Sequence, residues 1–205
     1  YILPDFLTHE ECDSIMMKAG PRLTRSEASI RGQSTASDVR TSEEIRLPKM
    51  ETPVIQAKMS RLCKAPLDHF ESLKVTRYRS GQYFQPHVDG AAMIQTGLSQ
   101  RAITIFIYLN DVGNGGETYF NNLDLTMKPR KGLACNHFPA KNVNHKKVIP
   151  FEKRKDNDLY CGHDRRTLHE AKSPIDCEKY ICQQWVRWGS GVPPFPTAQP
   201  DGTYI

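Results

Sequence analysis

From residue 71 onward the chain alternates short apolar runs with turn residues, and this pattern restricts the folds that are open to it. The runs are LKVTRYR, QYFQPHV, RAITIFIYLN, GETYF, GLACNHF, RTLHEA and YICQQWVRW. Runs of this length, bounded by Gly, Pro, Asn and Asp, are typical of β-strands. Seven or eight such strands without an internal repeat indicate a sandwich or a jelly roll.

Two helices are expected ahead of these strands. The stretch LTHEECDSIMMKAG, 7–20, places Thr8 at an N-cap with Glu11 three residues later, which is a capping box. The stretch TPVIQAKMSRLCKA, 52–65, starts with Thr52 as a cap and has Pro53 in its first turn. We therefore expect an α+β fold in which N-terminal helices pack on one face of the jelly roll.

The length of 205 residues suits a single domain covering 1–205, and 38% hydrophobic with 25% charged residues is typical of a globular protein. Within it we expect helical support in 1–70, the core in 71–190 and a Pro-rich tail in 191–205. The polar stretch 25–44 is expected to be a loop that acts as a lid, with a disordered insertion as the alternative. No run approaches the ~18 apolar residues of a membrane span.

The net charge and the cysteine content say little about which partners the protein binds. The formal net charge is +5, and the excess is concentrated in 141–155, which is typical of a solvated basic loop. Because this segment has no interleaved aromatic residues for base stacking beyond Phe151, we expect no nucleic-acid partner. Six cysteines occur without a CxxC motif, so a zinc ribbon is excluded, while disulfides and free thiols both remain open.

The stretch QPHVDG contains the strongest chemical signal. His87 and Asp89 are two positions apart, so on a strand both side chains point to the same face. Non-haem Fe(II) oxygenases bind iron with two histidines and one carboxylate, which leaves further coordination positions open. The second histidine must come from another strand, and both His137 in ACNHFP and His169 in RTLHEA lie in strand-like runs.

A basic residue favours His169. If the cosubstrate is 2-oxoglutarate, its distal carboxylate needs a cation deeper in the barrel. Lys179 begins the last strand-like run, ten positions after His169. A buried ammonium at this place would bind the carboxylate as a point charge in a low-dielectric pocket.

Together these segments resemble the prolyl 4-hydroxylases, which are Fe(II)- and 2-oxoglutarate-dependent dioxygenases with a double-stranded β-helix core. The resemblance runs through FLTHEECDSI, RTSEE, VTRYRSGQYFQPHVDG, RAITIFIYLNDVGNGGETYF, KPRKGLACNHF and TLHEAKSPIDCEKYICQQWVRW in the family's order. It implies that His87, Asp89 and His169 bind Fe(II) and that Lys179 binds 2-oxoglutarate.

The resemblance also implies roles around these four residues. Tyr78 and Thr118 are expected in the cosubstrate pocket. Arg40, in the family's RTS segment, is expected to contact substrate. Tyr83 is expected to do so for a separate reason, because its aromatic ring suits packing against a pyrrolidine ring. Trp185 is expected either beside the site or in the core.

The activity that the resemblance implies is 4-hydroxylation of proline in a peptide or protein, similar to that of procollagen-proline 4-dioxygenases. Molecular oxygen and 2-oxoglutarate would be consumed, succinate and CO2 released, and ascorbate used as a supporting cofactor. The alternatives are the same chemistry on a free amino acid, a small metabolite or another side chain, a binding module without catalysis, and a nucleic-acid demethylase. We expect the endoplasmic reticulum or secretory pathway, with the cytoplasm as the alternative; any targeting segment would lie outside this chain.

Two segments depart from the family pattern. The connection between NHFPA and DRRTLHEA is longer than usual and basic, and LACNHF replaces a more apolar strand. The second departure is expected to put Asn136 and His137 near the pocket. Both departures bear on the substrate rather than on the iron chemistry.

Overall fold

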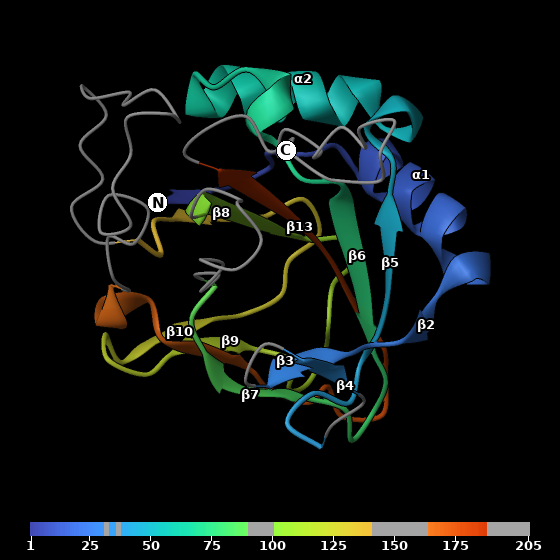
Figure 1. Ribbon diagram of the computed structural model, residues 1–205. Coiled ribbons are helices and arrows are strands. Elements are labelled where there is room, and N and C mark those ends of the chain that lie inside the picture. Colours follow the sequence, from blue (N-terminus) through green and yellow to red (C-terminus); the bar gives the residue numbers. More distant parts are fainter. Residues whose placement is uncertain (31–32, 36–37, 90–100, 141–163, 188–205) are drawn as a thin grey trace, which may run out of the picture.

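A computed structural model describes residues 1–30, 33–35, 38–89, 101–140 and 164–187 (Figure 1). The basic segment 141–155, the tail 191–205 and Cys161 lie outside the described residues. The five described cysteines are free thiols. None of the described helices combines the length and the apolar character that crossing a bilayer requires.

Two antiparallel sheets form the body of the molecule, and a two-stranded hairpin accompanies them. The seven-stranded sheet has the order β1 (Ile2–Leu3), β11 (Ala134–His137), β8 (Arg101–Tyr108), β13 (Lys179–Arg187), β6 (Leu73–Tyr78), β5 (Glu43–Leu47), β2 (Thr24–Arg25). The four-stranded sheet has the order β10 (Leu125–Met127), β9 (Thr118–Phe120), β12 (His169–Ala171), β7 (Phe84–His87). The hairpin pairs β3 (Ala28–Ile30) with β4 (Gln33–Thr35).

The two larger sheets face each other across a small aromatic core. Phe106 and Tyr108 of β8 are buried in one cluster with Phe120 of β9 and Ala171 of β12. Because successive side chains of a strand point to opposite faces, the same strands also present a second set of residues to the outer side. Two antiparallel sheets packed in this way are consistent with a jelly-roll core.

The outer face of the seven-stranded sheet carries the larger core. Figure 1 shows α1 (His9–Ala19) and α2 (Pro53–Cys63) on the side of this sheet that is away from the four-stranded sheet. Side chains of both helices belong to one buried cluster with the outward residues of β5, β6, β8, β11 and β13. Short 3-10 turns occur at Gly20–Arg22, Lys49–Glu51, Leu67–His69 and Arg165–Thr167.

The two helix starts turned out differently from one another. At α1 the capping box is present, since Thr8 Oγ1 accepts from the Glu11 amide at 3.2 Å and the Glu11 carboxylate accepts from the Thr8 amide at 2.9 Å. At α2 Pro53 occupies the first turn as expected, but the Thr52 side chain makes no capping bond. Its hydroxyl is buried without a hydrogen-bond partner among the described residues, so the expected cap was wrong in this respect.

Each of the seven expected runs contains a strand, namely β6, β7, β8, β9, β11, β12 and β13. The expectation of a continuous loop in 25–44 was wrong. This stretch contributes the hairpin β3–β4 and the start of β5, and Glu43 pairs with Arg77 of β6. Backbone pairing holds these segments, with β3 and β4 in a sheet of their own and β5 between β6 and β2. Residues 31–32 and 36–37 lie outside the description, and the lid remains a prediction.

We expect Thr8→Ala to lower the free energy of unfolding by about 1 kcal/mol, because the first-turn amides of α1 lose their side-chain acceptor. Urea denaturation followed by far-UV circular dichroism measures this change. Thr8→Ser is the matched control, since it keeps the hydroxyl. An equal loss in both variants would contradict the capping explanation.

Candidate metal centre

Pairing between strands of the four-stranded sheet brings the sequence-distant ligands together. In the register of β12 with β7, His169 lies directly opposite His87. Asp89 follows His87 by two residues, just past the end of β7. One potential ligand atom from each of these three residues lies within 4.8 Å of the other two. The structure therefore assembles the expected two-histidine, one-carboxylate group.

Backbone contacts fix the tautomer of both histidines. His87 Nδ1 lies 2.8 Å from the Gln85 carbonyl oxygen, and His169 Nδ1 lies 2.8 Å from the Thr167 carbonyl oxygen. A carbonyl can only accept, so each Nδ1 carries the proton and each Nε2 keeps its lone pair for a metal. Burial lowers the pKa of both imidazoles, that of His87 well below its usual value, which favours the neutral form that binds metal.

The Asp89 side chain is a buried carboxylate held by polar neighbours. Burial alone would raise its pKa, but the adjacent imidazoles of His137, His169 and His87 hold the pKa of Asp89 well below its usual value. Gln183 of β13 donates from Nε2 to Asp89 Oδ2 at 3.0 Å. Two neutral imidazoles and one ionised carboxylate are a donor set that suits Fe(II), so these residues fit the expected ion.

His137 lies beside this group without joining it. Its Nε2 is 3.4 Å from Asp89 Oδ2, yet it is not among the three residues whose ligand atoms converge. Its ring packs edge-on against Phe120 and His169, at centroid distances of 5.5 and 5.2 Å. Neither ring nitrogen has a hydrogen-bond partner within the described part of the chain. The expectation that LACNHF puts a polar group near the pocket thus holds for His137. Asn136 points to the other face, since residues alternate along β11.

Lys179 forms a second polar site, between the sheets. It is fully buried, opposite Tyr78 in the pairing of β13 with β6, and its Nζ lies 4.4 Å from the Tyr78 ring centroid. Nζ donates to the Gly116 carbonyl at 3.0 Å and to the Lys172 carbonyl at 3.3 Å. Burial lowers the pKa of Lys179 to about 7.

A glycine turn gives Lys179 its first acceptor. Gly116 has φ +73°, and the preceding Gly115 has φ +69° with Ser173 O only 2.4 Å from where a Cβ would lie. Both positions therefore require glycine. No carboxylate of the described residues forms an ion pair with Lys179, so this buried cation suits an anionic ligand.

The other expected residues lie near these two sites. Tyr78 is buried, which raises the pKa of its hydroxyl. Thr118 is buried on β9, with its Oγ1 2.8 Å from the Tyr108 hydroxyl. Sequence reasoning missed Tyr108 and Gln183, although their alternation within β8 and β13 was a usable signal.

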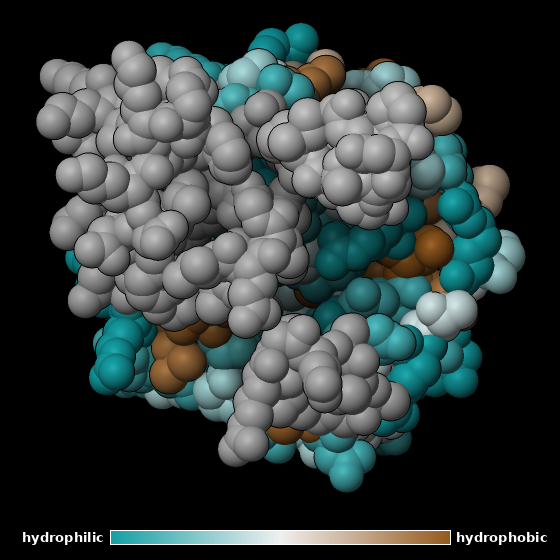
Figure 2. All heavy atoms as spheres, viewed as in Figure 1, coloured by the Kyte–Doolittle hydropathy of each residue, from teal (hydrophilic) through white to brown (hydrophobic). Residues whose placement is uncertain are grey.

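Arg40 and Tyr83 lie near the outer end of β7. Arg40 forms an ion pair with Glu44, and its guanidinium lies 4.9 Å from the Phe84 ring centroid. The Tyr83 backbone is bound on both sides to Thr41. Figure 2 shows the gap between the sheets opening to the surface, where the described side chains are largely hydrophilic.

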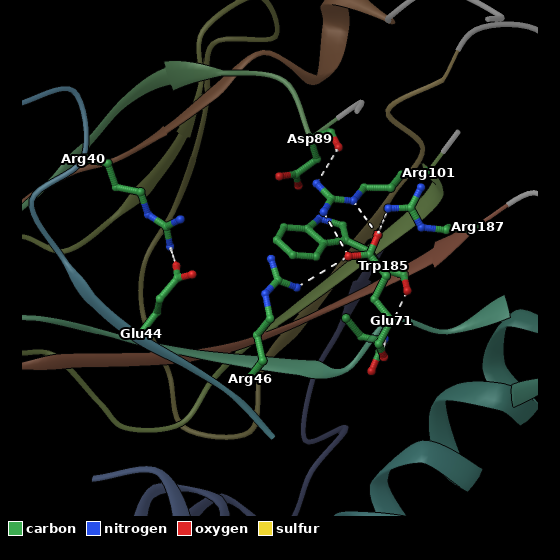
Figure 3. Close-up of polar contacts among 9 residues, drawn as sticks. Arg40, Glu44, Arg46, Glu71, Asp89, Arg101, Trp185 and Arg187 are labelled. Atoms are coloured by element: carbon green, nitrogen blue, oxygen red, sulfur yellow. Dashed lines mark hydrogen bonds and ion pairs between the residues drawn. The ribbon is translucent and has the colours of Figure 1, made fainter. Parts of the chain in front are cut away.

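Trp185 is buried but is not part of either apolar cluster. Figure 3 shows it among charged side chains, with the Arg101 guanidinium 3.5 Å from its ring centroid. Arg101 Nη1 also donates to the Asp89 carbonyl at 3.3 Å. Of the two expectations for Trp185, the geometry supports a place beside the site. Arg101 and Glu71, which flank it, were not expected from the sequence.

Comparisons with known proteins agree with this geometry. Residues 73–187 match the family model described as "2OG-Fe(II) oxygenase superfamily". The chain is 32% identical to prolyl 4-hydroxylase 1 of Arabidopsis thaliana, over 91% of this chain and 68% of that protein. It is 26% identical to prolyl 4-hydroxylase 13 of the same plant, over 91% and 70%. The collagen prolyl hydroxylase of Paramecium Bursaria Chlorella virus-1, solved with 2OG, superposes with a TM-score of 0.66 at 26% identity, covering 91% of this chain and 94% of that chain.

We expect His87→Ala, Asp89→Ala and His169→Ala each to weaken metal binding by roughly a hundredfold or more, because each removes one of three ligands. Titration calorimetry with Zn(II) in place of Fe(II) measures this without turnover, and circular dichroism checks the fold. His137→Ala is the control and should lose less than about tenfold. Loss of binding in His137→Ala with normal binding in His169→Ala would overturn this ligand set.

Proposed function

Because the chain belongs to the prolyl 4-hydroxylases within the 2OG-Fe(II) oxygenase superfamily, we propose that it hydroxylates C4 of proline in a peptide or protein. Membership makes the chain an Fe(II)- and 2-oxoglutarate-dependent dioxygenase. The observation that carries the proposal is a convergent His–Asp–His group at the four-stranded sheet, together with a buried lysine of the seven-stranded sheet that has no ion-pair partner among the described residues.

His87, Asp89 and His169 would hold the iron through two Nε2 atoms and one carboxylate oxygen. When bound, Fe(II) supplies the activation of dioxygen, coupled to oxidative decarboxylation of 2-oxoglutarate to succinate and CO2. The protein's part is positioning. The Gln85 and Thr167 carbonyls hold the imidazole rings, and Gln183 holds the carboxylate, so the three side chains would present their ligand atoms to the ion in fixed orientations.

Lys179 would bind the distal carboxylate of 2-oxoglutarate, with Tyr78 and Thr118 beside it. The ammonium is already oriented by two carbonyl acceptors, so little side-chain freedom is lost when the anion binds. Burial excludes water from the pair and strengthens the charge interaction. Ascorbate is proposed as a supporting reductant.

Peptide recognition is proposed near Arg40, Tyr83 and Trp185. A proline-rich segment is already ordered as an extended left-handed helix, which lowers the entropy lost on binding. The alternative is the same chemistry on a free amino acid, a small metabolite or another side chain, which would need few contacts beyond the metal.

We expect kcat/KM to rise steeply from free proline to a proline-rich peptide of about ten residues, because each added residue that contacts the protein adds binding energy. Mass spectrometry should locate the hydroxyl on proline C4, with one succinate released for each hydroxylation. A flat series, or hydroxylation of another residue, would contradict the peptidyl-proline assignment and leave the dioxygenase chemistry standing.

We expect 2-oxoglutarate binding to take up about one proton at pH 8, because Lys179 is mostly neutral above its pKa of about 7 and must be charged to pair with the carboxylate. Affinity should therefore fall as the pH rises above 7. Calorimetry on Zn(II)-loaded protein, in buffers of different ionisation enthalpy, counts the protons. Lys179→Arg, which stays charged, should take up none. Equal uptake in both proteins would remove Lys179 from the pocket.

A further inference from the structure

A group of basic side chains surrounds Trp185 next to the metal centre. We call Arg46, Lys74 and Arg101 the basic cluster. The Arg101 guanidinium, the Lys74 ammonium and the Arg46 guanidinium lie 3.5, 4.2 and 5.1 Å from the Trp185 ring centroid. They come from three strands, β8, β6 and β5, so no local spacing in the sequence predicts that they lie together.

One member of the basic cluster is hydrogen-bonded to the backbone of Asp89, a proposed metal ligand. Arg101 donates to the backbone carbonyl of Asp89, and Figure 3 shows this bond beside the Trp185 ring. Lys74 is opposite Gln183 in the pairing of β6 with β13, and Gln183 itself donates to the Asp89 carboxylate. A group bound at the cluster therefore lies close to a proline held at the metal.

The Glu71 carboxylate pairs with several of the cations in this region. Glu71 accepts from Arg101 at 2.7 and 3.0 Å and pairs with Arg46 at 3.5 Å and with Arg187 at 2.8 Å. Within the described residues no other carboxylate forms an ion pair with a member of the basic cluster. The nearby Glu44 is paired with Arg40, and Asp89 faces the histidines. Glu71 is thus the carboxylate that forms ion pairs with the basic cluster among the described residues, and it contacts Arg46 and Arg101 but not Lys74.

Lys74 is the member that a purely structural role does not explain. The Arg101 guanidinium already has partners, since it stacks on the Trp185 indole and binds both carboxylate oxygens of Glu71. Lys74 is buried, with 3% of its surface exposed, and the contact described for its ammonium is with the face of the Trp185 ring rather than with a carboxylate. Burial lowers its pKa well below the usual value for lysine. Burying an ammonium without an acceptor is costly, and a substrate carboxylate would supply that acceptor.

We propose that the substrate carries an acidic residue close to the target proline, and that Lys74 and Arg46 bind its carboxylate. This inference rests on the proposed hydroxylation of peptidyl proline. Arg46 suits the role because its side chain is 45% exposed and its contact with Glu71 is long, so it can turn toward a bound peptide. Neutral proline repeats would leave the Lys74 ammonium without an acceptor.

The test uses ten-residue peptides with one proline, flanked on both sides by Glu, by Gln or by Lys, and with both ends blocked. We expect kcat/KM to be roughly tenfold higher for the Glu peptide than for the Gln peptide, and lowest for the Lys peptide. Added salt should reduce the difference. A Gln peptide with a free C-terminal carboxylate separates an acidic side chain from a chain end; preference for that peptide over the Glu peptide would contradict the proposal.

Variants link the preference to the cluster. Lys74→Gln should bring the Glu-to-Gln ratio of kcat/KM toward one, and the half-exposed Arg46→Gln should shift it in the same direction. Lys18→Gln, an exposed lysine on α1, is the matched control and should leave the ratio as it was. Fluorescence anisotropy of labelled peptides on Zn(II)-loaded protein gives the same comparison without turnover.

The outcomes separate the two proposals. Equal kcat/KM for the Glu and Gln peptides, with hydroxyproline formed from both, overturns the acidic preference and leaves peptidyl-proline hydroxylation intact. A preference for Glu that survives both Lys74→Gln and Arg46→Gln overturns the role of the cluster. No hydroxyproline from any peptide, a neutral proline-rich one included, overturns the proposed function and this inference with it.

Discussion

The pairing of β12 with β7 is the contact on which the site depends. It sets His169 directly opposite His87, and β9 on the other side of β12 holds that strand in place. Because side chains alternate along a strand, a shift of one residue in this register would turn a ligand away from the metal. The backbone carbonyls that orient both imidazoles belong to the same two segments, so ligand position and ring orientation are set together.

Much of the site was predictable from the sequence. Some of its residues lie within one strand, and the others follow at a characteristic spacing. The pair His87 and Asp89 needs only the alternation of one strand, and Lys179 follows the distal histidine by a fixed interval. The choice between His169 and His137 was harder, since both lie in strand-like runs, and it depended on Lys179 and on the resemblance. The strand order gives the physical reason, because it puts β12 next to β7 and β11 in the other sheet.

The features that the sequence did not predict have physical reasons. Strands β1 and β10 have two and three residues, too few to show alternation. The hairpin β3–β4 forms a sheet of its own, and β5 has only two apolar residues, Ile45 and Leu47, so neither gave a clear strand pattern in the sequence. The cations around Trp185 come from separate strands, so their convergence is a property of the sheet. Thr52 lies at the N-cap of α2 as expected, but its side chain makes no capping hydrogen bond.

The inward residues of strand β13 set the distance between the proposed binding positions. Its inward residues include Lys179 at one end, Gln183 beside the metal ligand Asp89, and Trp185 two residues further on. At ~3.3 Å per residue, the backbone advances ~13 Å from Lys179 to Gln183 and ~20 Å to Trp185. An inhibitor that joins a dicarboxylic acid to a proline-like ring would need a linker matched to this fixed spacing, because a strand paired on both sides cannot stretch to accommodate another.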